Sequence, residues 1–331
     1  MSMTQQATVV RRDVSGERVA GLTLLERAVR TARRAGASRV EVVDREPAPD
    51  PAALVLIADR VYDPAEVRRQ AEDGTPATAL PAGTPAERAL AERALYDALR
   101  KPSDGFVSRH LNRRLSLAVT RLLLPTGITP NLMTVVASAF GVAGVALVFR
   151  ATWGALAAGA VLVQLQSILD GCDGEIARLK LESSRFGEWF DNVTDDLVNA
   201  AFGLGLGYAS SVLCAQPLWW WLGVYAAGAI SAYDAVVYAQ LIRRHGGSGN
   251  PFAFRWWYQK DDRTVAARMT GAAAVLHALA RRDTFLFAFM LLCLARLPQV
   301  AVLWYAIVST GYLLMTIVHA ARGGMPLEKA A

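Results

Sequence analysis

Four aspartates lie close together near the middle of the chain, between strongly apolar segments. They are Asp170, Asp173, Asp191 and Asp195, in the stretch DGCDGEIARLKLESSRFGEWFDNVTDD. Like charges beside apolar segments repel one another and are poorly solvated, so ionisable residues in such places usually serve a function. Divalent metal would keep them ionised, and oxygen ligands suit magnesium, manganese or calcium. Two ions held by four carboxylates would form a clamp for a phosphoryl or pyrophosphate group.

The first two aspartates share a predicted helix with small residues and an arginine. At about 100° per residue, five side chains of this helix fall within one arc of roughly 140°. Small residues there let a flat or bulky ligand approach the backbone, and an arginine offers a forked donor to phosphate. The arc consists of Asp170, Asp173, Gly174, Ala177 and Arg178.

The other two aspartates share a face of the next predicted helix with a glycine. Gly187, Asp191 and Asp195 recur at every fourth position, and such positions are neighbours on a helix surface. Two helices joined by a short turn can direct all four carboxylates into one volume. The alternative is that arginines or solvent neutralise the four acids, but the joint spacing of acids, small residues and arginine favours a ligand site.

These residues form the pattern D-x2-D-G-x2-A-R-x8-G-x3-D-x3-D, and with it the chain resembles the CDP-alcohol phosphotransferase (CDP-alcohol phosphatidyltransferase) family. The resemblance implies that a CDP-alcohol binds with its pyrophosphate on two magnesium or manganese ions. The hydroxyl of an acceptor alcohol would attack the β-phosphorus, and CMP would leave. The donor of this chain would be either CDP-diacylglycerol, giving a phospholipid head-group exchange, or CDP-inositol, giving a soluble inositol phosphodiester.

The same resemblance implies a role for each residue of the pattern. It makes Asp170, Asp173, Asp191 and Asp195 metal ligands, with Asp195 also the general base, since a base must lie close to the acceptor hydroxyl. The nucleotide would contact Gly174, Ala177, Arg178 and Gly187.

Two further pairs of residues are candidates for contacts with the substrates, and each pair also has a possible structural role. Asn131 and Thr134, at the start of the first apolar segment, would either contact the nucleotide or cap a helix. Arg281 and Arg282 would either grip the phosphate of a phosphorylated acceptor or anchor the chain at the membrane surface.

The elements that must position these residues are membrane helices. The chain has 331 residues, of which 53% are hydrophobic, and its mean hydropathy is +0.26. About 20 apolar residues of helix cross a hydrocarbon core of roughly 30 Å. We therefore predict six spans, which are Leu132–Phe149, Ala151–Leu169, Leu197–Leu213, Pro217–Ile242, Thr284–Leu297 and Gln299–Ala321.

Basic residues predict how these spans are oriented. Arginines and lysines gather before the first span and in alternate loops, and the first residues contain no apolar signal-peptide core. By the positive-inside rule, we expect both termini and the aspartates on the cytoplasmic side of an inner (plasma) membrane. The net charge of +6 is then mostly juxtamembrane, and no nucleic-acid partner is expected.

Three domains are predicted along the chain. Residues 1–100 alternate between strand and helix patterns and indicate a small cytoplasmic α/β domain. Residues 101–126 include FVSRHLNRRLSLAVTRLLL, with arginines on one side, and indicate an amphipathic helix in the membrane interface or, alternatively, a soluble helix packed on the first domain. Residues 127–325 form the six-helix domain.

A second resemblance extends beyond the aspartates. The junction LRKPSDGFVSRHLNRRLSLAVTRLLLPTGITPNLMT, the TPN at Thr129–Asn131 and the RRD at Arg281–Asp283 are similar to archaeal and bacterial enzymes that fuse a cytidylyltransferase to a di-myo-inositol phosphate phosphate synthase. This implies CDP-inositol as donor and inositol phosphate as acceptor. The amino-terminal domain departs from that group, because residues 1–20 contain Gly16 alone where a glycine-rich loop is expected, so we expect it to be a shortened, inactive nucleotidyltransferase relative.

Two other functions compete with a transferase. An ion or proton transporter could use the acidic cluster, but would place its acids nearer mid-membrane, with broken helices. A membrane-anchored nucleotidyltransferase would need the missing glycine-rich loop. We therefore predict a transferase that acts on a CDP-alcohol donor and a small alcohol or phospho-alcohol acceptor in the bilayer and, by family resemblance, forms a homodimer.

Overall fold

The computed structural model describes residues 5–47, 54–100, 104–244 and 271–322. Two compact units are formed. The first contains Met1–Lys101, Thr120–Ile128 and Glu175–Glu182, and the second contains Pro102–Val119, Thr129–Gly174 and Ser183–Ala331. The basic loop predicted between the fourth and fifth spans falls at 245–270, outside the described residues.

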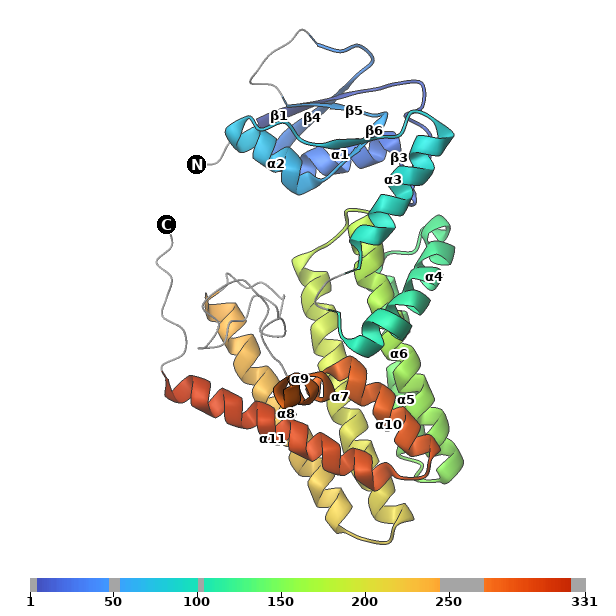
Figure 1. The fold of residues 1–331 in the computed structure, drawn as a ribbon, viewed down its shortest axis with the longest axis vertical. Helices are drawn as coiled ribbons and strands as arrows, with labels where there is room; N and C mark the ends of the chain where they lie inside the picture. Colours follow the sequence, from blue (N-terminus) through green and yellow to red (C-terminus); the bar gives the residue numbers. More distant parts are fainter. Residues whose placement is uncertain (1–4, 48–53, 101–103, 245–270, 323–331) are drawn as a thin grey trace. The chain divides into compact units, whose positions relative to one another are not determined.

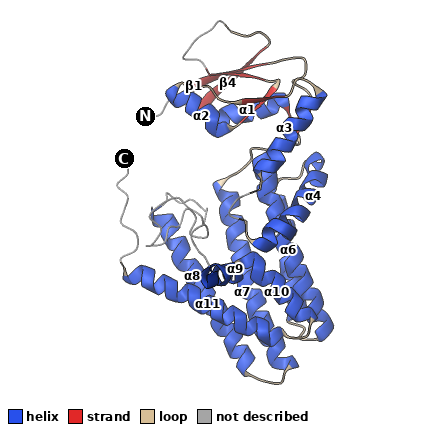
Figure 2. Cartoon of the chain, viewed as in Figure 1, coloured by secondary structure: helices blue, strands red, loops and turns tan. Residues whose placement is uncertain are grey.

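The first unit holds a three-stranded parallel sheet, shown in red in Figure 2. Strand β1 (Gln5–Val10) lies between β4 (Ala37–Val43) and β5 (Leu54–Ile57). Helices α1 (Leu24–Arg34) and α2 (Pro64–Asp73) pack against it, and α3 (Pro85–Ala98) follows (Figure 1). Alanine, valine and leucine side chains of β1, β5, α1 and α2 form the core. The predicted α/β domain is therefore confirmed in outline.

Side-chain caps satisfy the first amide groups of α1 and α2 in this unit. Thr23 and Glu26 form a capping box at α1, and the Asp63 side chain accepts the amide of Ala65 at α2. These bonds satisfy amide groups that lack partners within the helix.

Two antiparallel pairs were not predicted in this unit. They are β2 (Arg18–Val19) with β3 (Leu22–Thr23), and β6 (Arg60–Tyr62) with β7 (Ala79–Pro81). Strand β7 has little apolar alternation that would predict a strand, and its partner β6 is not adjacent to it in sequence.

The chain is helical from Phe106 to Leu123, as predicted, with an unforeseen π-helical turn at Ser108–Asn112 before α4 (Arg113–Leu123) and a 3-10 turn at Leu124–Thr126 after it. Its buried residues include a polar stripe of Asn112, Ser116 and Thr120, whereas Leu122 is exposed. An exposed apolar side is consistent with a membrane surface, but that placement stays a prediction.

The second unit is helical (Figure 1). Its helices are α5 (Pro130–Val148), α6 (Trp153–Leu179), α7 (Arg185–Leu213), α8 (Leu218–Arg244), α9 (Gly271–Ala280), α10 (Arg282–Leu294) and α11 (Pro298–Ala321). Helices α6, α7, α8, α10 and α11 contribute to one apolar core. Helix α6 continues unbroken into the first unit, which contains its last turns.

Four of the described helices are long and apolar enough to cross a membrane, namely α5, α6, α8 and α11. Six spans were predicted, and the other two stay predictions. Helix α7 combines an acidic amino-terminal half, which contains the aspartates, with an apolar carboxyl-terminal half. Helix α10 has 13 residues, which at about 1.5 Å per residue is shorter than the roughly 30 Å hydrocarbon core.

Candidate active site

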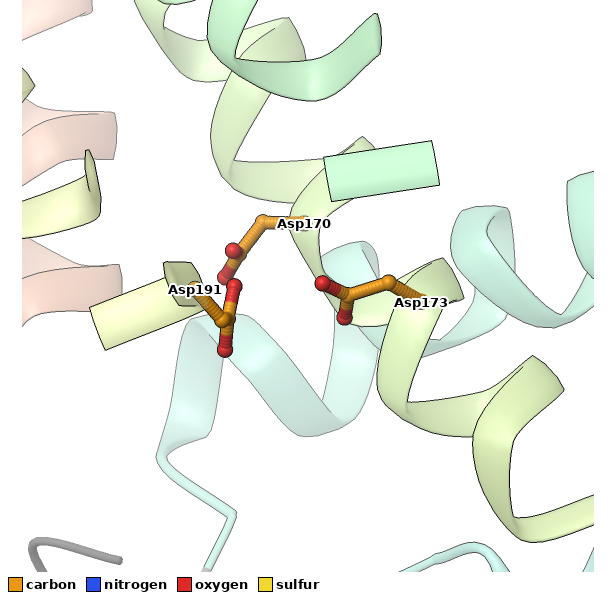
Figure 3. A group of neighbouring side chains, drawn as sticks. All are labelled: Asp170, Asp173 and Asp191. Atoms are coloured by element: carbon orange, nitrogen blue, oxygen red, sulfur yellow. The ribbon is translucent and has the colours of Figure 1, made fainter. Parts of the chain in front are cut away.

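Three of the four aspartates form one cluster. Asp170 and Asp173 come from α6 and Asp191 comes from α7, and one ligand oxygen from each lies within 4.8 Å of the others. Figure 3 shows the three carboxylates turned toward one another. Asp173 is buried and the other two are half-buried. The two helices therefore bring these aspartates together as their spacing predicts.

The cluster fits a divalent cation. Its donors are all carboxylate oxygens, the type that magnesium and manganese prefer. Asp191 Oδ1 is buried and accepts no hydrogen bond from the described residues. An acceptor of this kind is costly to bury unless a cation or donor meets it.

Asp195 lies outside this group of three and has different partners. It is buried, and its Oδ1 accepts a hydrogen bond of 2.6 Å from Gln166 Nε2. Its Oδ2 accepts a short hydrogen bond from Arg282 Nη1. The carboxylate is thus held from two sides, by α6 and by the start of α10.

Arg282 joins Asp195 to the cluster. Its Nη2 lies 3.6 Å from Asp170 Oδ2, so one guanidinium faces two of the four aspartates. Burial disfavours the charge on Arg282, but the carboxylates of Asp195 and Asp170 more than offset this and raise its pKa above the ordinary value. The Nε and Nη2 atoms of Arg282 are buried without a hydrogen-bond acceptor among the described residues.

Arg281 behaves differently from its neighbour. Its Nε lies 3.3 Å from Asp283 Oδ1, and Asp283 Oδ2 also accepts the amide of Ser108 at 2.8 Å. A Cβ at Gly105 would overlap the Asp283 carboxylate. The two adjacent arginines therefore have different partners. Arg282 contacts Asp195 and Asp170, whereas Arg281 contacts Asp283.

Thr134 and Asn131 do not cap a helix. The N-cap of α5 is Thr129, whose side chain accepts the amide of Leu132, so the capping alternative is wrong. Thr134 is buried and its hydroxyl donates to Asp173 Oδ2. Asn131 is exposed, and its Oδ1 would lie 3.1 Å from a Cβ at Gly187.

The remaining pattern residues line α6. The amide of Gly174 donates to Asp173 Oδ1. Ala177 and Arg178 are half-buried in the last turn of α6, in the first unit. Contact of these residues and of Gly187 with a nucleotide stays a prediction.

Gln166 is the site residue that the sequence reasoning missed. It precedes Asp170 by four positions and so shares its face of α6. That spacing was a usable signal, but glutamine carries no charge and stands within an otherwise apolar run.

Residues 127–317, more than half of the chain, match the CDP-alcohol phosphatidyltransferase family. The chain belongs to the CDP-alcohol phosphatidyltransferase family. It is therefore a transferase and a membrane protein, and the aspartates fall within the family segment.

Individual CDP-alcohol phosphatidyltransferases resemble the chain over shorter stretches. It is 40% identical over 144 residues, 43% of its length, to the bifunctional IPC transferase and DIPP synthase of Thermococcus kodakarensis. It is 40% identical over 134 residues, 40% of its length, to the protein of the same name in Rubrobacter xylanophilus. It is 32% identical over 115 residues, 35% of its length, to the phosphatidylinositol phosphate synthase of Mycobacterium tuberculosis.

The matches cover only part of each relative. They span 32% and 30% of the two bifunctional proteins and 47% of the mycobacterial synthase. The name of the mycobacterial relative describes it as a phosphatidylinositol phosphate synthase.

Proposed function

We propose that this membrane transferase moves a phospho-alcohol from a CDP-alcohol to a hydroxyl of inositol phosphate and releases CMP. The observation that carries the proposal is the cluster of Asp170, Asp173 and Asp191, joined to Asp195 by the Arg282 guanidinium. This arrangement supports the proposal, because the carboxylates suit a divalent metal ion and the guanidinium beside them suits an anionic acceptor.

The reaction exchanges a phosphoanhydride bond of the donor for a phosphate ester bond of the product. The acceptor oxygen forms a bond to the donor's β-phosphorus, and the bond from that phosphorus to the oxygen of CMP breaks. When bound, divalent ions would neutralise the aspartates and the pyrophosphate and make the phosphorus more electrophilic. The acceptor's proton goes to a carboxylate, and we assign this role to Asp195.

Asp195 suits the role of base because neighbouring side chains fix the orientation of its carboxylate. Gln166 and Arg282 each bond one of its oxygens, so the carboxylate is held in one orientation. A base must lie within hydrogen-bond reach of the hydroxyl that it deprotonates. Each carboxylate oxygen has a further lone pair that can accept this proton.

Arg282 is the proposed contact for the acceptor's phosphate. Two of its buried nitrogens have no hydrogen-bond acceptor among the described residues, and a guanidinium binds phosphate through paired N–H groups. Its attraction to Asp195 and Asp170 keeps it charged and beside the aspartates. An acceptor held there would present its hydroxyl next to Asp195.

We propose CDP-inositol as the donor. The support is the higher identity, 40%, to the bifunctional IPC transferase and DIPP synthase. CDP-diacylglycerol is the second candidate, favoured by the similarity to a phosphatidylinositol phosphate synthase. Both donors present the same CDP group, so the proposed chemistry is the same.

We also propose that the amino-terminal α/β domain does not make the donor. The loop after β1, RRDVSGERVAG, lacks the run of glycines that cradles a triphosphate. In this proposal the enzyme acts as a homodimer in the inner membrane, with the aspartates on the cytoplasmic side. CDP-inositol would then be supplied by a separate cytidylyltransferase reaction.

The test is CMP release by purified protein in detergent with magnesium or manganese. CDP-inositol and CDP-diacylglycerol are compared, each with and without inositol phosphate. CMP that depends on both CDP-inositol and inositol phosphate supports the proposal. If CMP is released from CDP-diacylglycerol instead, CDP-diacylglycerol is the donor. If neither compound releases CMP, both are rejected as donors.

A further inference from the structure

Three arginines of α1 contact the carboxyl end of α6. Arg27 Nη2 lies 2.9 Å from the carbonyl oxygen of Leu179. Arg30 Nη1 lies 2.8 Å from the carbonyl oxygen of Lys180. Arg34 Nε lies 3.2 Å from the carbonyl oxygen of Leu181. The arginines are spaced i, i+3 and i+7, so they share one face of α1, and three consecutive carbonyls each receive one of them.

The end of α6 needs such donors. The last carbonyls of a helix have no partner within it and carry partial negative charge. The amide of Glu182 bonds the Ala177 carbonyl at 2.8 Å and the amide of Leu181 bonds the Arg178 carbonyl at 3.3 Å. Backbone bonds therefore satisfy the preceding two carbonyls, and the arginines satisfy the three that follow.

The backbone at this helix end is strained. Leu181 has a φ of +56°, a left-handed conformation that costs a side-chain-bearing residue free energy and that glycine usually occupies. Such a conformation persists where its surroundings hold it in place. The charge-assisted bonds from α1 provide that hold, and Arg30 also pairs with Glu182 at 2.6 Å.

Other contacts of the first unit fix the same segment. The buried Glu175 accepts a hydrogen bond of 2.6 Å from Thr120. The Lys180 ammonium donates to the carbonyl of Ile128 at 2.7 Å. Arg27 is itself buried, which lowers its pKa to about 10 and leaves it charged at neutral pH.

We propose that Arg30 and Arg34, with Arg27, are positioning residues for the transferase site. Helix α6 is unbroken from Trp153 to Leu179, so fixing its last turn fixes the rotation of the helix that carries Asp170 and Asp173. This assigns the α/β domain a present role, which is to clamp the end of α6. The inference rests on the proposed function in taking those aspartates as the metal site.

The double variant Arg30→Met/Arg34→Met tests whether these contacts position α6. It removes the side-chain bonds from Arg30 and Arg34 to residues 180–182, which follow the end of α6. Arg27 is less suitable, since it also bonds the carbonyls of Val19 and Ala20. Arg33→Met is the matched control, because Arg33 is exposed on the same helix. Arg30→Lys/Arg34→Lys keeps the charge and one donor at each position.

Two readouts do not depend on turnover. Hydrogen exchange of the amides at 176–182 should speed up by about tenfold or more in the methionine variant. Binding of Mn²⁺, followed by electron paramagnetic resonance, should weaken by about tenfold. Arg33→Met should match the wild type in both readouts, and the lysine variant should recover most of each loss. Exchange at β1 and β5 in the same experiment reports whether the α/β domain is folded.

Unchanged exchange at 176–182, or faster exchange with unchanged Mn²⁺ binding, would overturn the inference. If the methionine variant unfolds the sheet, the single variant Arg34→Met replaces it in both readouts. A wild type that binds Mn²⁺ but releases no CMP from any donor would reject the proposed function and leave the clamp to be judged by these readouts alone.

Discussion

Asp195 differs from the other three aspartates in what holds it. Gln166 and Arg282 each bond one of its oxygens, whereas the other three face one another. This difference between Asp195 and the cluster of three aspartates supports a separate role for Asp195 in proton transfer.

The substitution Asp195→Asn tests that role. It keeps the size of the side chain and removes the base, so CMP release should fall by about 10²–10⁴-fold while the protein elutes normally from a sizing column in detergent. The control is Asp196→Asn, because Asp196 follows Asp195 in the chain but accepts its hydrogen bond from Tyr238. A normal rate in Asp195→Asn would remove this residue as the base.

Arg282→Ala tests the acceptor contact. Hydrogen bonds to charged groups contribute about 1.5–3 kcal/mol, so the apparent KM for inositol phosphate should rise by roughly 10- to 100-fold, with a smaller change for the donor. Arg281→Ala is the control, since that side chain pairs with Asp283, and its KM should stay near the wild-type value. Equal effects of Arg282→Ala on donor and acceptor would indicate an anchoring role instead.

At the scale of elements, a glycine sets how closely helices α7 and α11 pack. A Cβ at Gly203 of α7 would overlap the ring of Tyr305 on α11, and Tyr305 is buried and cannot move aside. A Cβ at Gly228 of α8 would meet no atom within 4 Å.

Gly203→Ala should therefore destabilise the protein by about 1–3 kcal/mol through overpacking. Gly228→Ala should be neutral or stabilise it by about 0.5–1 kcal/mol, because alanine favours helix over glycine. The thermal midpoint in detergent measures both. Equal midpoints for the two variants would show that α7 and α11 do not pack as closely as the structure indicates.

For the whole molecule, the acidic cluster predicts dependence on metal. Chelation with EDTA should abolish CMP release, and magnesium or manganese should restore it. A cation that binds only the folded state also stabilises it, so Mn²⁺ should raise the thermal midpoint of the wild type.

Asp191→Asn is the matched variant for that stabilisation. It removes one carboxylate charge from the cluster with little change in volume, so Mn²⁺ should shift its midpoint less than that of the wild type. An identical shift in both proteins would place the bound metal elsewhere.

The amino-acid sequence was enough to predict the class of the protein and the helical positions of its aspartates. Apolar runs and an i, i+4 spacing are local signals, because each depends on residues within a few turns of one another. The residue pattern is also confined to a short stretch of the chain, and the family that it indicates is confirmed by the match over residues 127–317.

The tertiary structure alone decided which partners each group meets. It placed Thr134 on Asp173, and it placed Gln166 and Arg282 on Asp195. It also paired β6 with β7 and directed the α1 arginines onto the end of α6. These contacts join residues up to 152 positions apart. The sequence around each of these polar side chains contains no pattern that predicts so distant a partner. Only the packing of the helices brings such groups within hydrogen-bonding distance.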